Sequence, residues 1–202
     1  MSNLFIVAAP SGCGKTSLVK ALIEKTKNLC VSVSHTTRAA RSGEVHGENY
    51  FFVSKNEFDE INNNNGFIES ACVFDNHYGS AKQTVKDLLT QNQDVILEID
   101  WQGARQVEKF FSGIISIFII PPSIEALRER LTDRGQDNPT IIERRMKDAV
   151  SEMQHYDEFD YLVVNDDFDI ALNELSTIIH SQRLNIEQQS IKHQDLLKAL
   201  IG

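Results

Sequence analysis

Short runs of apolar residues alternate along this chain with stretches in which apolar residues recur every three or four positions. A run of about five apolar residues is too short for an independent helix and is typical of a buried strand, whereas the longer spacing places apolar side chains on one helical face. The runs predict strands at residues 4–9, 30–34, 50–53, 67–71, 73–78, 94–99, 114–120 and 161–164.

Helix signals fill most of the gaps between these strands. Ser54 and Glu57 have the spacing of a capping box, which predicts that a helix begins there. Thr140 is expected to start another helix after Pro139 breaks the chain, and this helix runs to about residue 155. Apolar spacing and capping residues predict further helices from residue 16, around 85–89, from 101, from 123 and around 171–179.

This alternation favours an α/β fold with a mostly parallel sheet covered by helices on both faces. Strands that are apolar throughout fit such a sheet, because parallel strands are buried on both sides. Residues 37–80 differ, since short strands and polar turns dominate there, and they suggest a small lobe inserted into the α/β core. Residues 186–202 form a polar, weakly amphipathic tail, for which assembly into a homo-oligomer and simple fraying remain equal alternatives.

The charge of the chain limits its partners. Its 29 acidic and 20 basic residues give a formal net charge of −9 over 202 residues, so no nucleic-acid partner is expected. No apolar run approaches the ~18 residues of a membrane span, and the first nine residues lack the basic start of a signal peptide. Three cysteines without a C-x-x-C pair indicate reduced thiols, so a cytoplasmic protein without membrane contact is predicted.

The strongest chemical signal is a phosphate-binding loop between the first strand and the first helix. Gly12 and Gly14 can adopt backbone angles closed to other residues, which turns successive N–H groups inward. Lys15 is then expected to reach the β- and γ-phosphates of a nucleotide, and Thr16 to offer its hydroxyl to Mg²⁺. The consensus for such a loop has glycine at its first position, where this chain has Ala9. The alternative interpretation of this segment is a glycine-rich strand-to-helix turn with a surface lysine. The candidate residues are Ala9, Pro10, Ser11, Gly12, Cys13, Gly14, Lys15 and Thr16.

Two neighbouring features carry hypotheses of their own. Cys13 lies beside a helix N-terminus, a position that lowers a thiol pKa, so its alkylation is expected to inhibit the protein. Strand 94–99 brings Glu98 and then Asp100 to its carboxyl end, where either carboxylate is expected to orient Mg²⁺ through water. The alternative for Asp100 is a cap on the following helix.

Arg38 and Arg41 follow strand 30–34 among serine, threonine and glycine residues. This setting suits the binding of an anion, because the planar guanidinium group matches the geometry of phosphate oxygens. The alternative is that the two arginines serve only solubility.

Several motifs in a fixed order resemble the guanylate kinase family, and bacterial members above all. They are S-x-S-x-T-T-R-x-x-R-x-G-E-x-x-G-x-x-Y over residues 32–50, Tyr-Gly-Ser at 78–80 after a strand with Glu69, I-D-x-Q-G at 99–103 and V-N-D-D at 164–167. The resemblance covers about residues 3–184. It implies an ATP:GMP phosphotransferase that forms ADP and GDP with Mg²⁺, also accepts dGMP, and recycles GMP in purine nucleotide metabolism.

The same resemblance implies a P-loop NTPase-type fold and a single domain over residues 1–202. Its parts are a core of residues 1–33, 81–125 and 149–184, an inserted mixed GMP-binding lobe of residues 34–80, a helical lid of residues 126–148 and a tail of residues 185–202.

For the GMP site, the resemblance implies that two arginines and two tyrosines hold the phosphate, while Glu69 and Ser34 read guanine. The chemistry agrees, because a carboxylate accepts hydrogen bonds from both N1–H and the exocyclic amine of guanine, whereas adenine has no N1–H. On the residues alone, Glu69 is more simply a cross-strand ion-pair partner. The implied GMP-binding residues are Ser34, Arg38, Arg41, Tyr50, Glu69, Tyr78, Ser80 and Asp100.

Residues 127–148 hold basic and acidic side chains in nearly equal number, which by composition favours a solvated helix pair. The resemblance instead implies a lid whose arginines close over ATP, with Arg128 and Arg144 left at the surface. It also implies that Arg134 binds ATP and that Asn165 contacts adenine. No general base is assigned, because a monophosphate oxygen is already a competent nucleophile. The implied catalytic residues are Lys15, Arg38, Arg130, Arg134 and Arg145.

Three other functions fit parts of the sequence. A guanylate-kinase-like interaction module lacks a working phosphate loop, whereas Lys15 and Thr16 are present here. A GTPase switch needs an N-K-x-D motif, which this sequence does not contain. A kinase for another nucleoside monophosphate has no use for Glu69 and Ser34 as guanine-reading residues.

Overall fold

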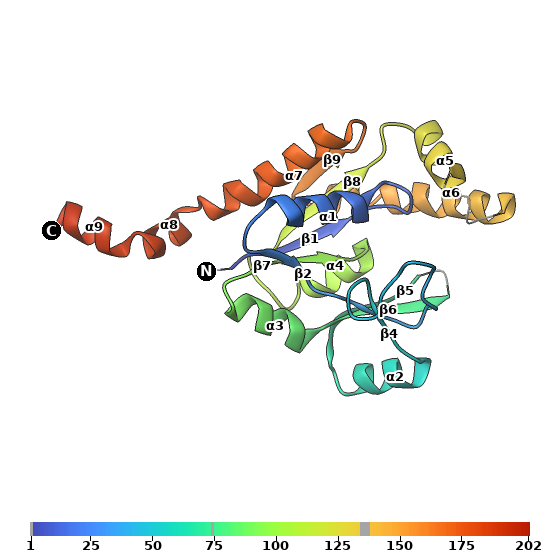
Figure 1. Ribbon diagram of the computed structural model, residues 1–202, viewed down its shortest axis with the longest axis horizontal. Coiled ribbons are helices and arrows are strands. Elements are labelled where there is room, and N and C mark those ends of the chain that lie inside the picture. The colour runs from blue at the N-terminus through green and yellow to red at the C-terminus, as the bar shows by residue number, and fades with distance from the viewer. Residues whose placement is uncertain (1, 74, 134–137) are drawn as a thin grey trace.

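The structure, a computed structural model, describes residues 2–73, 75–133 and 138–202 (Figure 1). Its strands are β1 (Leu4–Ala8), β2 (Leu29–Val31), β3 (His35–Thr36), β4 (Phe51–Phe52), β5 (Phe67–Val73), β6 (Asn76–Ala81), β7 (Asp94–Glu98), β8 (Ile115–Ile120) and β9 (Tyr161–Val164). Its α-helices are α1 (Lys15–Lys25), α2 (Lys55–Asn63), α3 (Lys82–Thr90), α4 (Trp101–Val107), α5 (Ile124–Asp133), α6 (Pro139–Met153), α7 (Phe168–Arg183), α8 (Ile186–Lys192) and α9 (Gln194–Ile201). A short 3₁₀ helix, η1, spans Tyr156–Glu158.

The larger sheet has the strand order β2-β7-β1-β8-β9, and all of its pairings are parallel. Side chains of the central strand β1 alternate between two hydrophobic clusters. Phe5 and Val7 belong to the cluster on the sheet face that α1 and α7 cover. Leu4 and Ile6 belong to the cluster on the opposite face, which α3 and α4 cover (Figure 1). The predicted α/β fold with helices on both faces is therefore confirmed.

A second sheet has the order β4-β3-β6-β5 and is mixed, as expected for this part of the chain. Strand β3 pairs parallel with β4 and antiparallel with β6, which in turn pairs antiparallel with β5. The predicted capping box is present, since Ser54 N and Oγ both donate to Glu57 Oε2 at 2.7 Å. Strand β3, with only two residues, carries no periodic signal and was not expected.

Helices α5 and α6 pack over the loop that joins β1 to α1. Buried Leu127, Leu131 and Met146 form one cluster with Cys13 of that loop. Helix α6 begins at Pro139, one residue before the predicted start, because Asn138 and not Thr140 caps the helix. Asn138 Oδ1 accepts a hydrogen bond from Ile141 N at 3.0 Å, and proline at the first helical position has no N–H to satisfy.

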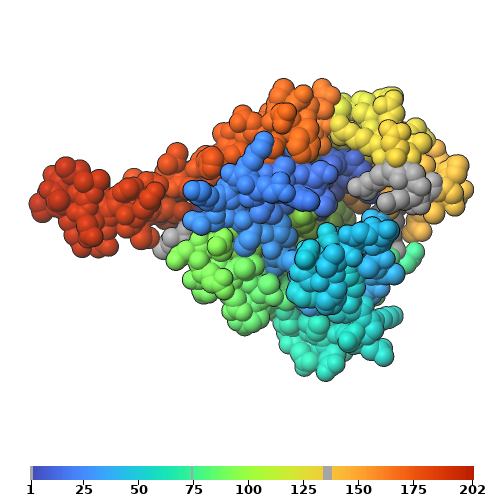
Figure 2. Space-filling model, in the orientation of Figure 1, coloured from blue at the N-terminus to red at the C-terminus, as the bar shows by residue number. Residues whose placement is uncertain are grey.

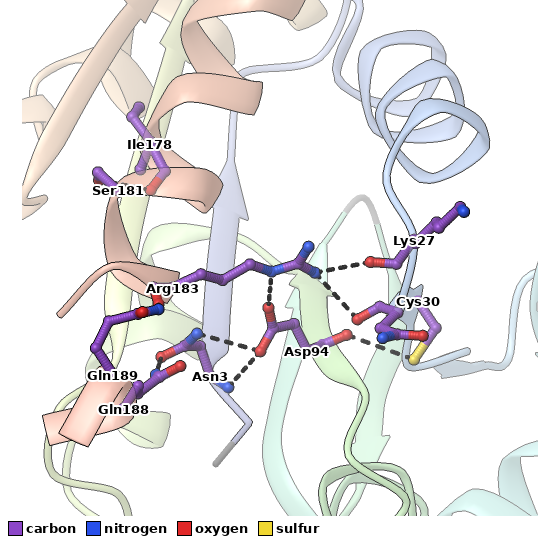
Figure 3. Close-up of polar contacts among 10 residues, drawn as sticks. Asn3, Lys27, Cys30, Asp94, Ile178, Ser181, Arg183, Gln188 and Gln189 are labelled. Atoms are coloured by element: carbon purple, nitrogen blue, oxygen red, sulfur yellow. Dashed lines mark hydrogen bonds and ion pairs between the residues drawn. The ribbon is translucent and has the colours of Figure 1, made fainter. Parts of the chain in front are cut away.

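The end of α7 is fastened to the amino end of the larger sheet (Figure 3). Arg183 Nε donates to Asp94 Oδ2 at 2.7 Å, and Asp94 Oδ1 also accepts from the backbone N of Asn3 at 2.6 Å. Gln188 of α8 donates to Asn3 Oδ1 at 2.5 Å. Beyond these contacts α8 and α9 extend away from the body of the protein (Figure 2). Of the described helices, none has the length and hydropathy needed to cross a membrane.

Candidate active site

A cleft of about 380 Å³ opens where the carboxyl ends of β1 and β7 face the second sheet. The carboxyl edge of a parallel sheet is where α/β proteins place their ligand sites. The sequence-predicted residues that line the cleft are Ala9, Pro10, Ser11, Gly12, Cys13, Gly14, Lys15, Thr16, Ser34, Arg38, Arg41, Tyr50, Glu69, Tyr78, Glu98, Asp100 and Arg145. The lining does not include Ser80, Arg130 or Asn165, and Arg134 lies outside the described residues.

The phosphate loop has the backbone that its glycines suggested. Gly12 and Gly14 have φ of 95° and 83°, in the left-handed region that favours glycine. Lys15 is the first residue of α1, so its N–H lies at the positive end of that helix. Its side chain reaches the residue that follows β7, where Lys15 Nζ donates to the carbonyl of Ile99 at 3.4 Å. The loop therefore presents a cation and backbone donors to the same cleft.

Two carboxylates stand at the end of β7. Thr16 Oγ1 donates to Glu98 Oε2 at 3.4 Å, so the hydroxyl and this carboxylate lie together at the mouth of the loop. Asp100 lines the cleft and also caps α4, since Oδ1 accepts from Gly103 N at 2.8 Å. The capping role proposed as an alternative for Asp100 is thus real and coexists with its place in the cleft. Within the described parts of the chain, no group of three or more metal-ligating side chains is assembled.

Arg38 is held in place by Glu44, a residue of the motif to which the sequence assigned no role. Its Nη1 and Nη2 donate to the two Glu44 oxygens at 3.0 and 2.8 Å, and Arg41 N donates to Glu44 Oε2 at 2.7 Å. Burial lowers the pKa of the Arg38 guanidinium, but its bonds to Glu44 outweigh burial and hold that pKa above its ordinary value. Burial, with a smaller contribution from Glu98, raises the pKa of Tyr50 to about 12, so its hydroxyl remains a neutral donor.

Glu69 is deeply buried, with 3% of its surface exposed. The residue paired with it across the β5–β6 ladder is Ser80, which is no cation, so the cross-strand ion-pair alternative is wrong. Ser80 Oγ lies 3.1 Å from Ser34 Oγ, which places both serines beside this carboxyl group. A Cβ at Gly103 would come within 2.7 Å of Glu69 Oε2, so glycine there makes room for the carboxyl group.

Burial raises the pKa of Glu69 from 4.5 to about 7, and Asp100 adds to the rise while hydrogen bonds from Ser80 oppose it. Because the folded pKa exceeds the unfolded one, the folded state binds more protons between these values, and its stability falls as pH rises. The stability that the protonated Glu69 carboxyl contributes to the folded state is present below pH 4.5 and is lost as pH rises through about 7.

We therefore expect Glu69→Gln to match the unsubstituted, substrate-free protein in stability at about pH 4 but to exceed it at about pH 8. A shift of this size corresponds to a difference of roughly 3 kcal/mol in unfolding free energy. Urea denaturation at both pH values measures it, with the exposed Glu60→Gln as the control. Equal pH dependence in Glu69→Gln and the unsubstituted protein would contradict the buried carboxyl group.

Glu152 lines the cleft from α6 and was missed by the sequence reasoning. Burial raises the pKa of its carboxyl to about 7, with Asp100 adding to the rise and Lys15 opposing it. The available signal was its spacing, because Glu152 follows Arg145 by two helical turns and so shares its face of α6.

The other lid residues divide into surface and interior groups. Arg128 pairs with Glu143, and Arg144 pairs with Asp148, all on exposed parts of α5 and α6, as predicted for the two arginines. Arg130 instead turns inward, where Nη2 donates to the carbonyl of Asn165 at 2.9 Å. Its Nη1 is buried and has no hydrogen-bond partner among the described residues.

One sequence expectation changes. Cys13 is fully buried, and burial followed by the charge of Glu152 raises its thiol pKa to about 12, so the expectation of a reactive, low-pKa thiol is wrong. The helix N-terminus does not overcome the loss of solvent. Asn165 is also buried, and its Nδ2 donates to the carbonyl of Cys13 at 2.7 Å, while its contact with adenine stays a prediction.

Comparisons with known proteins agree with one another. The sequence model of one protein family, described as guanylate kinase, matches residues 1–182. The chain is 57% identical over 200 residues to a guanylate kinase of Saccharophagus degradans, covering 99% of this chain and 98% of that protein. It is 52% identical over 199 residues to a guanylate kinase of Methylococcus capsulatus, covering 98% of both. A crystal structure of guanylate kinase from Anaplasma phagocytophilum matches with a TM-score of 0.77 and 33% identity, covering 92% of this chain and 88% of the other.

Proposed function

The chain belongs to the guanylate kinase family and phosphorylates GMP, and from this premise we propose which of its residues carry out the transfer from ATP. The observation that carries the proposal is a single cleft that contains both the phosphate loop and the arginine, tyrosine and glutamate set of the second sheet. Two polyanions repel each other, so an acidic protein brings them together only where cations and backbone donors are concentrated.

We assign the donor ATP to the phosphate loop, residues 9–16. Its inward N–H groups and the start of α1 bind the phosphates, and Lys15 balances charge on the γ-phosphoryl group. Arg130, Arg134 and Arg145 complete this side when the lid closes. Nη1 of Arg130, which has no hydrogen-bond partner in the described parts of the chain, supports this role, because a buried guanidinium nitrogen is stabilised once it donates to a phosphate oxygen.

We assign the acceptor GMP to the face of the second sheet. Arg38, Arg41 and the hydroxyls of Tyr50 and Tyr78 bind its phosphate, and the bonds to Glu44 fix the place of the Arg38 guanidinium group in the cleft. Glu69, Ser34, Ser80 and Asp100 surround the base. The donors of guanine stabilise the ionised form of Glu69, so GMP binding is expected to lower its raised pKa.

The transfer itself needs no enzyme-bound intermediate. The residues above hold the GMP phosphate oxygen in line with the γ-phosphorus of ATP. The translational and rotational entropy of the two substrates is therefore lost on binding and not in the chemical step. Closure of the lid, residues 126–148, over the core, residues 1–33, 81–125 and 149–184, excludes water and so prevents hydrolysis of ATP. The lobe of residues 34–80 brings GMP, and the tail, residues 185–202, lies outside the site.

We also propose Mg²⁺ as the cofactor that accompanies ATP. The donor set fits this hard cation, since the Thr16 hydroxyl and the Glu98 carboxylate lie together beside the loop and Asp100 follows on β7. Bound there with the nucleotide, Mg²⁺ supplies neutralisation of the β- and γ-phosphates. Glu98 or Asp100 would hold such an ion through its water ligands. A separate proposal concerns location. The three cysteines include no C-x-x-C pair and indicate reduced thiols, which supports a cytoplasmic location.

Release of ADP with MgATP and each of GMP, dGMP, AMP, CMP and UMP tests the acceptor assignment. Turnover is expected with GMP and dGMP, and about 10⁴-fold lower kcat/KM with AMP, because adenine leaves the buried Glu69 unpaired. Comparable turnover of AMP and GMP would remove the assigned role of Glu69.

A further inference from the structure

Four side chains at the carboxyl end of α6 and the start of α4 form a closed circuit of contacts. The imidazole ring of His155 stacks on the indole ring of Trp101, with centroids 3.7 Å apart and planes inclined by 12°. Arg105, one turn after Trp101 on α4, lies over the same indole ring at 4.7 Å. Glu158 of η1 closes the circuit, because it accepts from Arg105 Nε and Nη2 and lies beside His155 Nδ1, each at 2.6 Å. We call these four residues the α4–α6 clamp.

The Glu158 carboxyl group is the acceptor of the α4–α6 clamp. Its hydrogen bonds with Arg105 hold its pKa below the ordinary value, and the bond with His155 adds to this effect. An ionised carboxylate has no proton to donate, so Nδ1 of His155 carries the hydrogen of their bond. Although an exposed ion pair adds little to stability, this one sets the orientation of the imidazole ring that lies on Trp101.

The α4–α6 clamp joins two segments that carry cleft residues. Trp101 directly follows Asp100, whose side chain lines the cleft and caps α4. His155 lies just past the end of α6, the helix from which Arg145 and Glu152 line the cleft. The stack therefore fixes the carboxyl end of α6 at the corner between β7 and α4. Since α6 is one continuous helix, fixing its end also determines where its cleft residues lie.

Two carboxyl groups of the cleft are held near one another although their charges repel. Burial raises the pKa of Glu152 to about 7, and the charge of Asp100 adds to this rise while Lys15 opposes it. Repelling groups stay close only where other contacts hold their chain segments together. The stack of Trp101 on His155 lies next to both carboxyl residues in the chain, so it supplies such a contact.

We propose that His155 and Trp101 are positioning residues, whose stack sets the place of α6 and of its Arg145 for phosphoryl transfer. The proposal rests on the assignment of Arg145 to the transferring phosphoryl group. A donor that is fixed before the reaction loses no freedom when charge develops on its ligand. Because a displacement of about 1 Å can lower a rate about 100-fold, a contact at the end of the helix can control the rate of the reaction.

His155→Ala removes the stack and changes no residue that lines the cleft. We expect kcat at saturating MgATP and GMP to fall about 10-fold, because α6 is no longer held in one position. The Kd of GMP is expected to stay unchanged, since Asp100 is held by Gly103 N of its own helix at 2.8 Å. His155→Phe keeps a flat ring on Trp101 and is expected to retain kcat within about twofold.

Fluorescence reports the stack directly, because Trp101 is the only tryptophan of the chain. The emission maximum of His155→Ala is expected to shift to longer wavelength as water reaches the indole ring. That of His155→Phe is expected to stay near the unsubstituted value. His180→Ala, an exposed substitution of the same kind on α7, is the matched control and is expected to change neither kcat nor emission.

A double substitution separates positioning from an independent structural effect. A residue that acts through Arg145 loses its influence on kcat when Arg145 is absent. We therefore expect Arg145→Ala to lower kcat about 100-fold, and addition of His155→Ala to lower it little further. Losses that multiply to about 1000-fold would overturn the proposal, because the two residues would then act independently.

Unchanged kcat or unchanged emission in His155→Ala would also overturn the proposal. If that variant does not fold, Glu158→Ala decides the question, because exposed Glu158 lies outside the cleft lining and its loss frees the imidazole ring. A fall in kcat of about fivefold is expected for Glu158→Ala, and no fall would overturn the proposal. Arg145→Ala tests the premise separately, since full turnover in that variant removes the phosphoryl assignment itself rather than the role of His155 alone.

Discussion

Lys15→Ala is expected to lower kcat about 10³-fold while the protein stays folded, which is the size of loss that follows removal of a preorganised charge from a phosphoryl-transfer site. Within the residues that the structure describes, Lys15 Nζ donates one hydrogen bond, at 3.4 Å to the Ile99 carbonyl, and this weak bond contributes little to folding. The ammonium group therefore serves the nucleotide phosphates rather than the fold. ADP release at saturating MgATP and GMP measures the loss.

Lys20→Ala is the matched control, because Lys20 lies exposed on the same helix α1. It is expected to keep full turnover. Thermal unfolding of both variants establishes that each is folded, and GMP binding to Lys15→Ala is expected to persist because the acceptor residues lie on the second sheet. A folded Lys15→Ala protein with near-normal kcat would contradict the assignment of the loop.

Glu69→Gln is expected to lower kcat/KM for GMP about 10³-fold, with little change for AMP. The carboxylate accepts from N1–H and the exocyclic amine of guanine together, whereas the amide offers one acceptor and turns its NH₂ group toward a second donor. Sites that depend on buried hydrogen bonds lose the most when such a bond cannot form. The preference for GMP over AMP is therefore expected to collapse, and initial rates with both acceptors measure it.

The stability of Glu69→Gln provides the internal control for this result. Because the neutral amide removes the buried charge, the variant is expected to be at least as stable as the unsubstituted protein near neutral pH. The exposed Glu60→Gln is expected to change neither acceptor preference nor stability. If Glu69→Gln retained the full preference for GMP, the guanine contact would have to be sought elsewhere in the cleft.

Local signals predicted most of the elements of the fold. Each long strand of the larger sheet is an apolar run, and the capping box at Ser54 and the glycines at 12 and 14 act through their immediate neighbours. Such signals involve residues within a few positions of one another, so they are legible in the sequence. The two-residue strand β3 has no period, and apolar spacing placed the boundary between β5 and β6 at residue 72, whereas β5 ends at Val73 and β6 begins at Asn76.

The motifs also predicted most of the residues that line the cleft, since Lys15, Arg38 and Glu69 belong to patterns with fixed spacing. The states of these residues were not predictable. Glu69 has a raised pKa only because β5, β6 and α4 enclose it, and Cys13 is buried only because α5 and α6 cover the loop. For Cys13 the covering helices α5 and α6 begin more than 100 residues further along the chain, and for Glu69 helix α4 begins 32 residues further along.

The sequence by itself determined the class of fold, the phosphate loop and the guanylate kinase resemblance, because these follow from periodicity and from residues close together in the chain. The tertiary structure decided how the loop is held, with Asn165 bonded to Cys13 across 152 positions, and it brought Glu152 of α6 to the cleft. A hydrogen bond or a desolvated charge depends on distance in space, and only the folded chain defines that distance.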